Sequence, residues 1–230
     1  MIRAKEELVR KTAAKPTVIA YDGDTLRGSS ITKAVGPEAR YDVVYVLPPP
    51  PGWTAEDVSR LGLGAVAESP SFLFLWSGSS CEEVERGRAL LRGWGFRRAE
   101  DICWIKTNKG GSAKLPERKE MGSDGSEKES SEKKKRGDAL EGTSPPGEFL
   151  VRTVEHCIVG IKGTVVRASD THIVDANVDT DVIVSEERPT EEMYRRIEHF
   201  CIRQRRLVLF EAGEGRPGWI TVKCTTTRKQ

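Results

Sequence analysis

Short apolar runs alternate with longer amphipathic stretches along this chain, and this alternation limits the fold more than any other feature. The run SFLFLWSG (71–78) predicts a strand buried on both faces, and the next stretch, 81–94, has helical spacing. Other strands are predicted at 41–47, 97–108, 155–163, 181–187, 205–210 and 218–223, and a second helix at 190–201. Strands that alternate with helices favour an open, mostly parallel α/β sheet with helices on both faces, whose ligand crevice lies beyond the carboxyl ends of its strands.

Three segments fall outside this pattern. Residues 1–13 have apolar side chains at helical spacing among charges, so we predict an N-terminal helix that packs on the domain or on a partner. Residues 110–147 are rich in Gly, Ser, Lys, Glu and Pro, which predicts a disordered insertion. Because the strands on either side of this insertion lack partners of their own, residues 14–109 and 148–224 are predicted to form a single domain, with 225–230 as a tail.

Composition narrows the cellular setting. The 37 Lys and Arg residues nearly balance the 35 Asp and Glu residues, so any basic surface must be local. The five cysteines are widely spaced without a C-x-x-C pair, which argues against a zinc ribbon or a disulfide framework and favours a reducing compartment. No apolar run is long enough for a membrane span, so we expect a cytosolic or nuclear protein without a membrane partner.

The predicted strand at 41–47 ends in a proline run, Pro48–Pro51. Proline cannot continue a hydrogen-bonded ladder, so the chain leaves the sheet there along a stiff path. The segment Leu47-Pro48-Pro49-Pro50 offers carbonyl oxygens but no side chain that titrates. Taken alone, it is most simply a proline-rich exit loop.

Six long blocks of this chain carry a family resemblance: FLFLWSGS, GRALLRGWGFRRAEDICWIKTNK, EHCIVGIKGTVVR, ANVDTDVIVSEE, IEHFCIRQRRLVLF and RPGWITV. They resemble the adenosine-N6 methyltransferase family that acts on messenger RNA, and in particular its non-catalytic subunit. The resemblance covers about residues 3–222 apart from the insertion. It implies a Rossmann-like class I methyltransferase fold, a heterodimer with a catalytic homologue, a nuclear location and S-adenosylmethionine bound in that partner.

Leu47 to Pro50 lies where active relatives carry Asp-Pro-Pro and an aromatic residue. In those relatives the carboxylate and a proline carbonyl accept hydrogen bonds from the adenine amine, and the ring stacks on the base. Leu47 accepts nothing, and the lost acceptor costs about 1–3 kcal/mol in desolvation alone. The resemblance therefore implies a degenerate motif at Leu47, Pro48, Pro49 and Pro50 with no catalytic residue. Trp53 is either a substitute stacking ring or, as we favour, an aromatic cap over the proline loop.

The cofactor motifs depart from the family pattern as well. Active relatives have a Gly-Arg pair where this chain has Glu211-Ala212, and an Asn-Gln pair where it has Lys223-Cys224. The exchange removes donors for the ribose and carboxylate of S-adenosylmethionine. We therefore expect no cofactor on this chain, and Glu211 and Ala212 form a degenerate cofactor motif.

Basic residues are the remaining candidates for a binding role. Arg97, Arg98, Lys162 and Arg167 match residues that line a groove shared with the catalytic subunit, and as a set they are predicted to contact nucleic-acid phosphates. A second run of arginines is predicted to be a solvated face rather than a binding surface, because charge runs on a helix and its exit usually face solvent. It consists of Arg195, Arg196, Arg203, Arg205 and Arg206. The tetrad Lys133-Lys134-Lys135-Arg136 has three open interpretations: a nuclear-localisation signal, a nucleic-acid tether or a solvating segment.

The histidines do not indicate chemistry. His156 and His199 each follow a glutamate and precede Cys157 or Phe200, and we predict packed, hydrogen-bonded residues and no metal site. Glu155 and Glu198 are likewise expected to be structural.

These features predict a catalytically inactive methyltransferase-like subunit that stabilises a catalytic homologue and helps to bind substrate RNA. The same scaffold role in a DNA adenine-N6 methyltransferase complex is an alternative, since a phosphate-binding surface suits either polymer. An active S-adenosylmethionine-dependent methyltransferase and a standalone RNA-binding module are further alternatives. Cofactor binding by the chain alone would favour the active methyltransferase. Tight RNA binding by a stable monomer would favour the standalone RNA-binding module.

Overall fold

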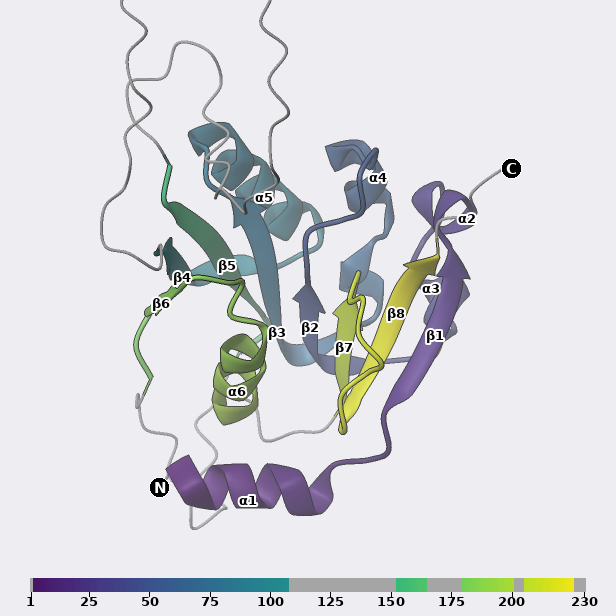
Figure 1. Cartoon of the computed structure of the whole chain (residues 1–230). Helices are drawn as coiled ribbons and strands as arrows, with labels where there is room; N and C mark the ends of the chain where they lie inside the picture. Colours follow the sequence, from purple (N-terminus) through teal and green to yellow (C-terminus); the bar gives the residue numbers. More distant parts are fainter. Residues whose placement is uncertain (1, 108–151, 165–178, 201–204, 226–230) are drawn as a thin grey trace, which may run out of the picture.

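The computed structural model describes residues 2–107, 152–164, 179–200 and 205–225. These residues form a mixed α/β structure around one eight-stranded sheet (Figure 1). In chain order the elements are α1 (Ile2–Thr12), β1 (Thr17–Asp22), α2 (Gly23–Arg27), α3 (Thr32–Val35), β2 (Tyr41–Val46), α4 (Ala55–Arg60), η1 (Leu63–Ala65), β3 (Ala67–Gly78), α5 (Cys81–Gly93), β4 (Arg97–Lys106), β5 (Val154–Lys162), β6 (Val182–Ser185), α6 (Thr190–Phe200), β7 (Arg206–Leu209) and β8 (Trp219–Thr225).

The strands lie in the order β1-β8-β7-β2-β3-β5-β4-β6. β5 runs antiparallel to both of its neighbours, β3 and β4, and every other pair is parallel, which confirms the mostly parallel sheet. All six residues of β2 are buried, as expected for a central strand covered on both faces.

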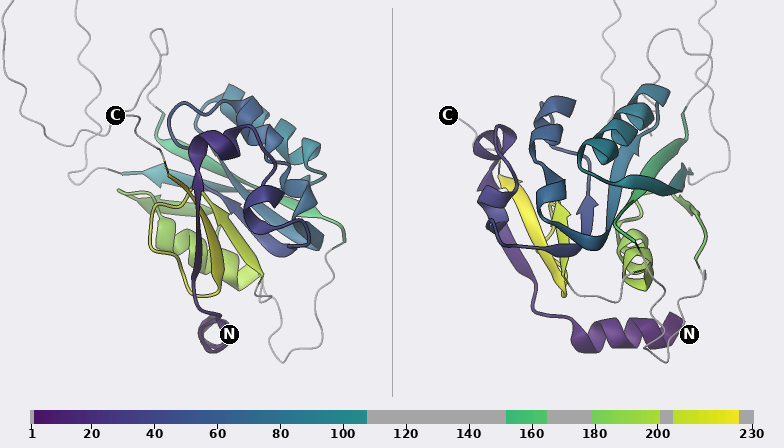
Figure 2. Two further views of the ribbon diagram at one scale, coloured as in Figure 1. Left: turned by 90° about the vertical axis from the view of Figure 1, so that its right-hand side faces the viewer. Right: turned by 180° about the vertical axis from the view of Figure 1, so that it is seen from behind.

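Helices cover both faces of the sheet, as the sequence predicts (Figure 2). One core lies under α2 to α5 and contains Leu63, Leu73 and Leu91. The other lies under α6 and contains an aromatic group in which the ring centroids of Tyr194 and Trp219 are 4.9 Å apart. The helix predicted at the N-terminus is present as α1, and it packs against α6 rather than on the sheet.

Two helices that follow the sheet strands begin at complete capping boxes. At α5 the Ser80 hydroxyl accepts from the Glu83 N–H at 3.0 Å, and the Glu83 carboxylate accepts from the Ser80 N–H at 2.8 Å. Thr54 and Asp57 form the same reciprocal pair at α4. Such pairs satisfy N–H groups that a helix start otherwise leaves without partners, and they fix where each helix leaves the sheet edge.

The arginine run near α6 is divided, because Arg195 and Arg205 are exposed whereas Arg196 and Arg206 are buried. Arg196 is 7% exposed and donates to the carbonyl of Thr180, and Arg206 is 1% exposed. Arg205 donates to both oxygens of buried Asp42, at 2.8 and 3.0 Å. The sequence pattern missed this because periodicity does not show which arginines meet a carboxylate or carbonyl from a distant element.

The predicted insertion 110–147 lies outside the described residues, so its disorder stays a prediction, as do the domain bounds. No helix within the described ranges is both long and apolar enough to cross a membrane.

Candidate functional site

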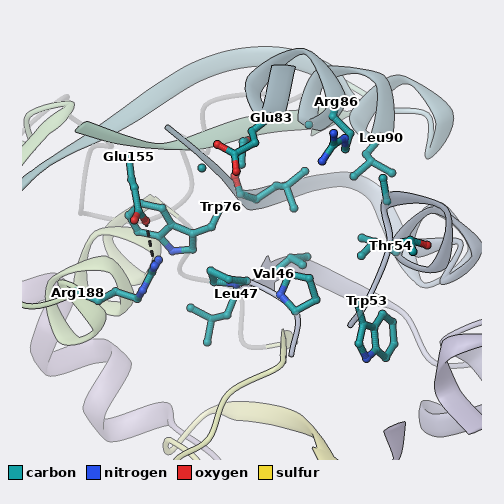
Figure 3. A pocket seen from close by; sticks show the side chains of 18 residues that line it. Val46, Leu47, Trp53, Thr54, Trp76, Glu83, Arg86, Leu90, Glu155 and Arg188 are labelled. Carbon is teal, nitrogen blue, oxygen red and sulfur yellow. Dashed lines mark hydrogen bonds and ion pairs between the residues drawn. The ribbon is translucent and has the colours of Figure 1, made fainter. Parts of the chain in front are cut away.

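A cavity of about 330 Å³ opens beyond the carboxyl ends of β2 and β3, beside the start of α5 (Figure 3). This is the edge at which the sequence predicts the ligand crevice. Its floor and walls are mostly apolar, and a few charged side chains stand at its rim. It is lined by Val46, Leu47, Pro48, Pro49, Trp53, Thr54, Ala55, Val58, Leu75, Trp76, Ser77, Gly78, Glu83, Arg86, Gly87, Leu90, Glu155 and Arg188.

The floor of the cavity carries the degenerate motif. Leu47 follows directly after β2 and is 6% exposed, and its N–H donates to the carbonyl of Leu209 at 3.2 Å. Its side chain joins the core under α6. The structure thus fixes an isobutyl group at the position where the resemblance implies a carboxylate in active relatives, and this side chain offers no hydrogen-bond acceptor.

Trp53 closes the proline loop toward β7. The backbone N–H of Trp53 donates to the carbonyl of Pro50 at 3.3 Å. The Trp53 ring meets the Phe210 ring edge-on, with centroids 5.0 Å apart. Because the ring also lines the cavity, it joins the proline loop to the end of β7. This packing favours the aromatic-cap interpretation of Trp53.

The two acidic residues at the rim are already bonded within the protein. Burial of Glu83 acts to raise its pKa, but the N–H groups of Ser80 and Ser79, at 2.8 and 2.9 Å, and the Ser80 hydroxyl bring the pKa below its ordinary value. Glu155 pairs with the Lys106 Nζ at 2.6 Å. Ionised carboxylates with such partners are poor general bases, because a base must be free to take up a proton.

Arg188 forms the far wall of the cavity. Its Nη2 donates to the Glu155 carboxylate at 2.9 Å, as Figure 3 shows, and its guanidinium lies 5.1 Å from the Trp76 ring centroid and 5.3 Å from that of Trp104. Two aromatic faces hold the cation by cation–π attraction. Sequence reasoning missed Arg188, because only the pairing of β4 with β5 and β6 brings its partners together.

The degenerate cofactor motif is also satisfied internally. Glu211 accepts from the Tyr194 hydroxyl at 2.9 Å and from the N–H groups of Ala212 and Gly213 at 3.0 and 3.2 Å. Burial, and then the Glu211 charge, raise the pKa of Tyr194, so its phenol stays protonated and donates. Phe210, just before, has φ 67°, a strained value for a bulky residue that turns the chain sharply after β7.

Lys223 and Cys224 lie on β8 beside β1. Burial raises the pKa of Cys224 to about 11, and the nearby charge of Asp22 adds to the effect. This thiol is therefore neutral at physiological pH. A neutral thiol replaces one of the amide side chains that the resemblance assigns to cofactor binding.

Three of the four predicted basic residues, Arg97, Arg98 and Lys162, lie at the opposite end of the sheet from the cavity. Arg97 and Arg98 begin β4 and are exposed, and they pair in register with Ile161 and Gly160 near the end of β5. Because β5 is antiparallel, its last residue, Lys162, reaches the same sheet end as the start of β4. The fold therefore brings three of the four predicted contacts to one edge, while Arg167, like Arg203, lies outside the described residues.

Lys162 differs from the two arginines. Its ammonium donates to the carbonyl oxygens of Gly64 and Ala67 at 2.8 and 2.9 Å, so two of its three donors hold the loop before β3. Arg98 keeps a longer, half-exposed contact of 3.5 Å to Asp101. No observation tests the phosphate contacts, but Arg97 and Arg98 are better placed for them than Lys162.

The chain matches the family model MT-A70 over residues 49–134 and 129–224. It is 36% identical over 248 residues to the N(6)-adenosine-methyltransferase non-catalytic subunit METTL14 of Xenopus laevis. The matched region covers 99% of this chain and 47% of the Xenopus protein. The Drosophila melanogaster protein of the same name is 36% identical over 250 residues, covering 96% and 54%. The N6-adenosine-methyltransferase non-catalytic subunit MTB of Arabidopsis thaliana is 37% identical over 206 residues, covering 82% and 22%.

The chain thus spans about half the length, or less, of these curated relatives. A family model that covers most of the chain, together with relatives that are more than one-third identical to it, goes beyond a likeness of fold. Leu47 at the cavity floor and the internally bonded Glu211 stand at the positions where the resemblance in the sequence implies degenerate catalytic and cofactor motifs. This chain belongs to the MT-A70 family.

Proposed function

We propose that this chain is a catalytically inactive, methyltransferase-like subunit of an adenine-N6 methyltransferase complex, with a Rossmann-like class I methyltransferase fold. One observation carries the proposal. Leu47 is buried at the carboxyl end of β2, where the resemblance implies a carboxylate in active relatives, and its side chain cannot accept a hydrogen bond from an adenine amine. The relatives named as non-catalytic subunits support the same conclusion.

The cofactor site supports the proposal independently. Where the resemblance implies a Gly-Arg pair that helps to bind the cofactor, this chain has Ala212, which has no donor side chain, and Glu211, whose carboxylate already accepts from Tyr194 and two backbone N–H groups. We propose that S-adenosylmethionine is bound by a catalytic homologue in a heterodimer and not by this chain.

In this complex the chain would stabilise its partner and bind substrate RNA through Arg97 and Arg98. Both arginines lie a strand length from the chain's own cavity, which suits a groove completed by a second subunit better than one leading to this cavity. DNA remains the alternative substrate, because phosphate contacts do not distinguish the two polymers. We also propose a nuclear location, where such a complex would meet new transcripts.

Calorimetric titration with S-adenosylmethionine tests the absence of a cofactor site. The full chain alone should give no binding heat, while the complex with the catalytic homologue should bind one cofactor per heterodimer. Micromolar binding by the isolated chain would contradict the proposal and favour an active methyltransferase.

Methylation assays with matched RNA and DNA oligonucleotides then identify the polymer. The chain alone should methylate neither, and the complex should methylate RNA. If the complex methylates only DNA, the chain has the same scaffold role in a DNA adenine-N6 methyltransferase complex, and the RNA proposal is wrong.

A further inference from the structure

Three side chains that can bind metal meet on the α5 face of strands β4 and β5. Asp101 and Cys103 occupy alternate positions of β4, and His156 pairs directly opposite Cys103 on β5. The intervening Ile102 points to the other face, into the core under α6. All three side chains are half-buried, and their ligand atoms lie within 4.8 Å of one another.

The distances suit coordination rather than proton relay. The Cys103 Sγ lies 3.6 Å and the Asp101 Oδ2 3.3 Å from the same atom, His156 Nδ1. A relay uses both ring nitrogens, one for each partner. Tetrahedral zinc with Zn–S of about 2.3 Å and Zn–N and Zn–O of about 2.0–2.2 Å puts S and N about 3.5 Å apart, and N and O about 3.3–3.4 Å apart.

The Asp101 carboxylate is incompletely satisfied. Its Oδ1 is buried, with no hydrogen-bond partner among the described residues. Its Oδ2 has His156 at 3.3 Å and Arg98 at 3.5 Å, both longer than the roughly 2.7–2.9 Å of a charge-assisted hydrogen bond. Buried carboxylate oxygens normally have partners, so this side chain has coordination capacity to spare.

We propose that Asp101, Cys103 and His156 bind a divalent metal ion, with zinc as the preferred ion. A thiolate, an imidazole and a carboxylate are zinc ligands, and water completes the tetrahedron. Binding releases the Cys103 thiol proton to solvent, and the metal replaces Arg98 at the Asp101 carboxylate. The ion would join β4 to β5 next to Arg98, and this proposal does not depend on the proposed function.

The sequence prediction of no metal site rested on the missing short Cys and His spacing. Cys103 and His156 are 53 positions apart, so only the antiparallel pairing of β4 with β5 brings them together. The proposal therefore replaces a prediction that local spacing alone supported.

Cobalt titration of the full chain, alone or in its complex, tests the site, with Co²⁺ as a spectroscopic probe for zinc. The wild type should show thiolate-to-cobalt charge transfer and the intense visible bands of tetrahedral cobalt, and both should disappear when one equivalent of Zn²⁺ is added. Cys103→Ser should remove the charge-transfer band and weaken metal binding by at least about 100-fold, because even the loss of a residue that only orients a ligand costs about 10–100-fold.

Cys81→Ser is the matched control, because Cys81 is exposed at the start of α5 and lies outside the cluster. It should bind cobalt as the wild type does. Zinc should also raise the melting temperature of the wild type and of Cys81→Ser but not that of Asp101→Asn, which provides a second variant if Cys103→Ser does not fold. The proposal fails if the wild type gives no thiolate band, if Cys103→Ser keeps it, or if zinc stabilises Asp101→Asn equally.

Discussion

Glu198 and Glu191 both bind Arg216, from very different environments. Glu198 is 7% exposed and also accepts from the Trp219 indole N–H at 2.8 Å, whereas the Glu191 side chain is 79% exposed. Removing one partner of a buried ion pair leaves the other charge without compensation, while exposed pairs contribute little. Substituting each carboxylate in turn therefore shows how much burial changes the contribution of an ion pair with the same guanidinium to the free energy of unfolding.

Glu198→Ala should lower the free energy of unfolding by about 1–3 kcal/mol, since it leaves the buried Trp219 indole N–H without its acceptor and leaves Arg216 paired only with the exposed Glu191. Glu191→Ala should lower it by less than about 1 kcal/mol. Urea unfolding of both variants measures the difference. Equal losses would mean that burial does not set the strength of these pairs.

Leu47→Asp introduces a carboxyl at the cavity floor but should not produce methylation, because Glu211 and Ala212 still stand where the resemblance implies cofactor-binding residues. Burial raises the pKa of the new carboxyl above its unfolded value of about 3.9. The folded state then holds its proton to higher pH than the unfolded state does, so Leu47→Asp should lose stability as pH rises through the folded pKa.

Leu47→Asn is the matched control, with nearly the same shape and no charge. Its stability relative to the wild type should not change with pH, whereas Leu47→Asp should be less stable than Leu47→Asn at pH 7 and approach it near pH 4. Denaturant midpoints across this range measure the comparison. Parallel curves for the two variants would show that the floor is open to water.

At the scale of secondary-structure elements, those with a clear apolar pattern follow from the sequence, and those without one do not. The helix predicted at 81–94 is α5, Cys81–Gly93, and the strand predicted at 205–210 is β7, Arg206–Leu209. The edge strand β1 was missed because its residues are exposed or half-buried and lack clear alternation. Helices α2 and α3 have only 5 and 4 residues, too few to show a helical period.

The start of α5 depends on its cap. Ser80→Ala removes the hydroxyl that accepts from the Glu83 N–H, and should lower the free energy of unfolding by about 1 kcal/mol. Ser79 contributes a backbone N–H to the same glutamate, so Ser79→Ala should have a much smaller effect. Thermal unfolding of the two variants distinguishes them, and similar losses would contradict a role for the hydroxyl.

At the scale of the whole molecule, the antiparallel strand β5 determines which residues share an edge. It carries Lys162 to the sheet end where Arg97 and Arg98 begin β4, and carries Glu155 to the opposite end, beside the cavity. Arg97, Arg98 and Lys162 are therefore separated from the cavity by the length of the sheet. Because of this separation, we propose that the nucleic acid binds in a groove shared with a partner subunit.

Arg97→Ala combined with Arg98→Ala should weaken RNA binding by the complex and lower the slope of log affinity against log salt by about 1.4, because each phosphate contact to a single strand contributes about 0.7. Lys15→Ala with Lys33→Ala removes the same charge from exposed positions far along the chain from β4. This control should leave the slope unchanged. Fluorescence anisotropy at several salt concentrations measures both, and an unchanged slope in the arginine variant would remove these residues from the interface.

The sequence by itself determined the α/β alternation, the buried central strands and the apolar side chain at position 47, because these depend on side-chain identity and local spacing. Only the tertiary structure decided that Lys162 holds a loop, that Arg188 lies between two tryptophans, and that Asp101, Cys103 and His156 converge. Periodicity along a chain shows which face of an element is buried. Which distant residues then meet depends on strand order and direction, which are set by the packing of the whole sheet.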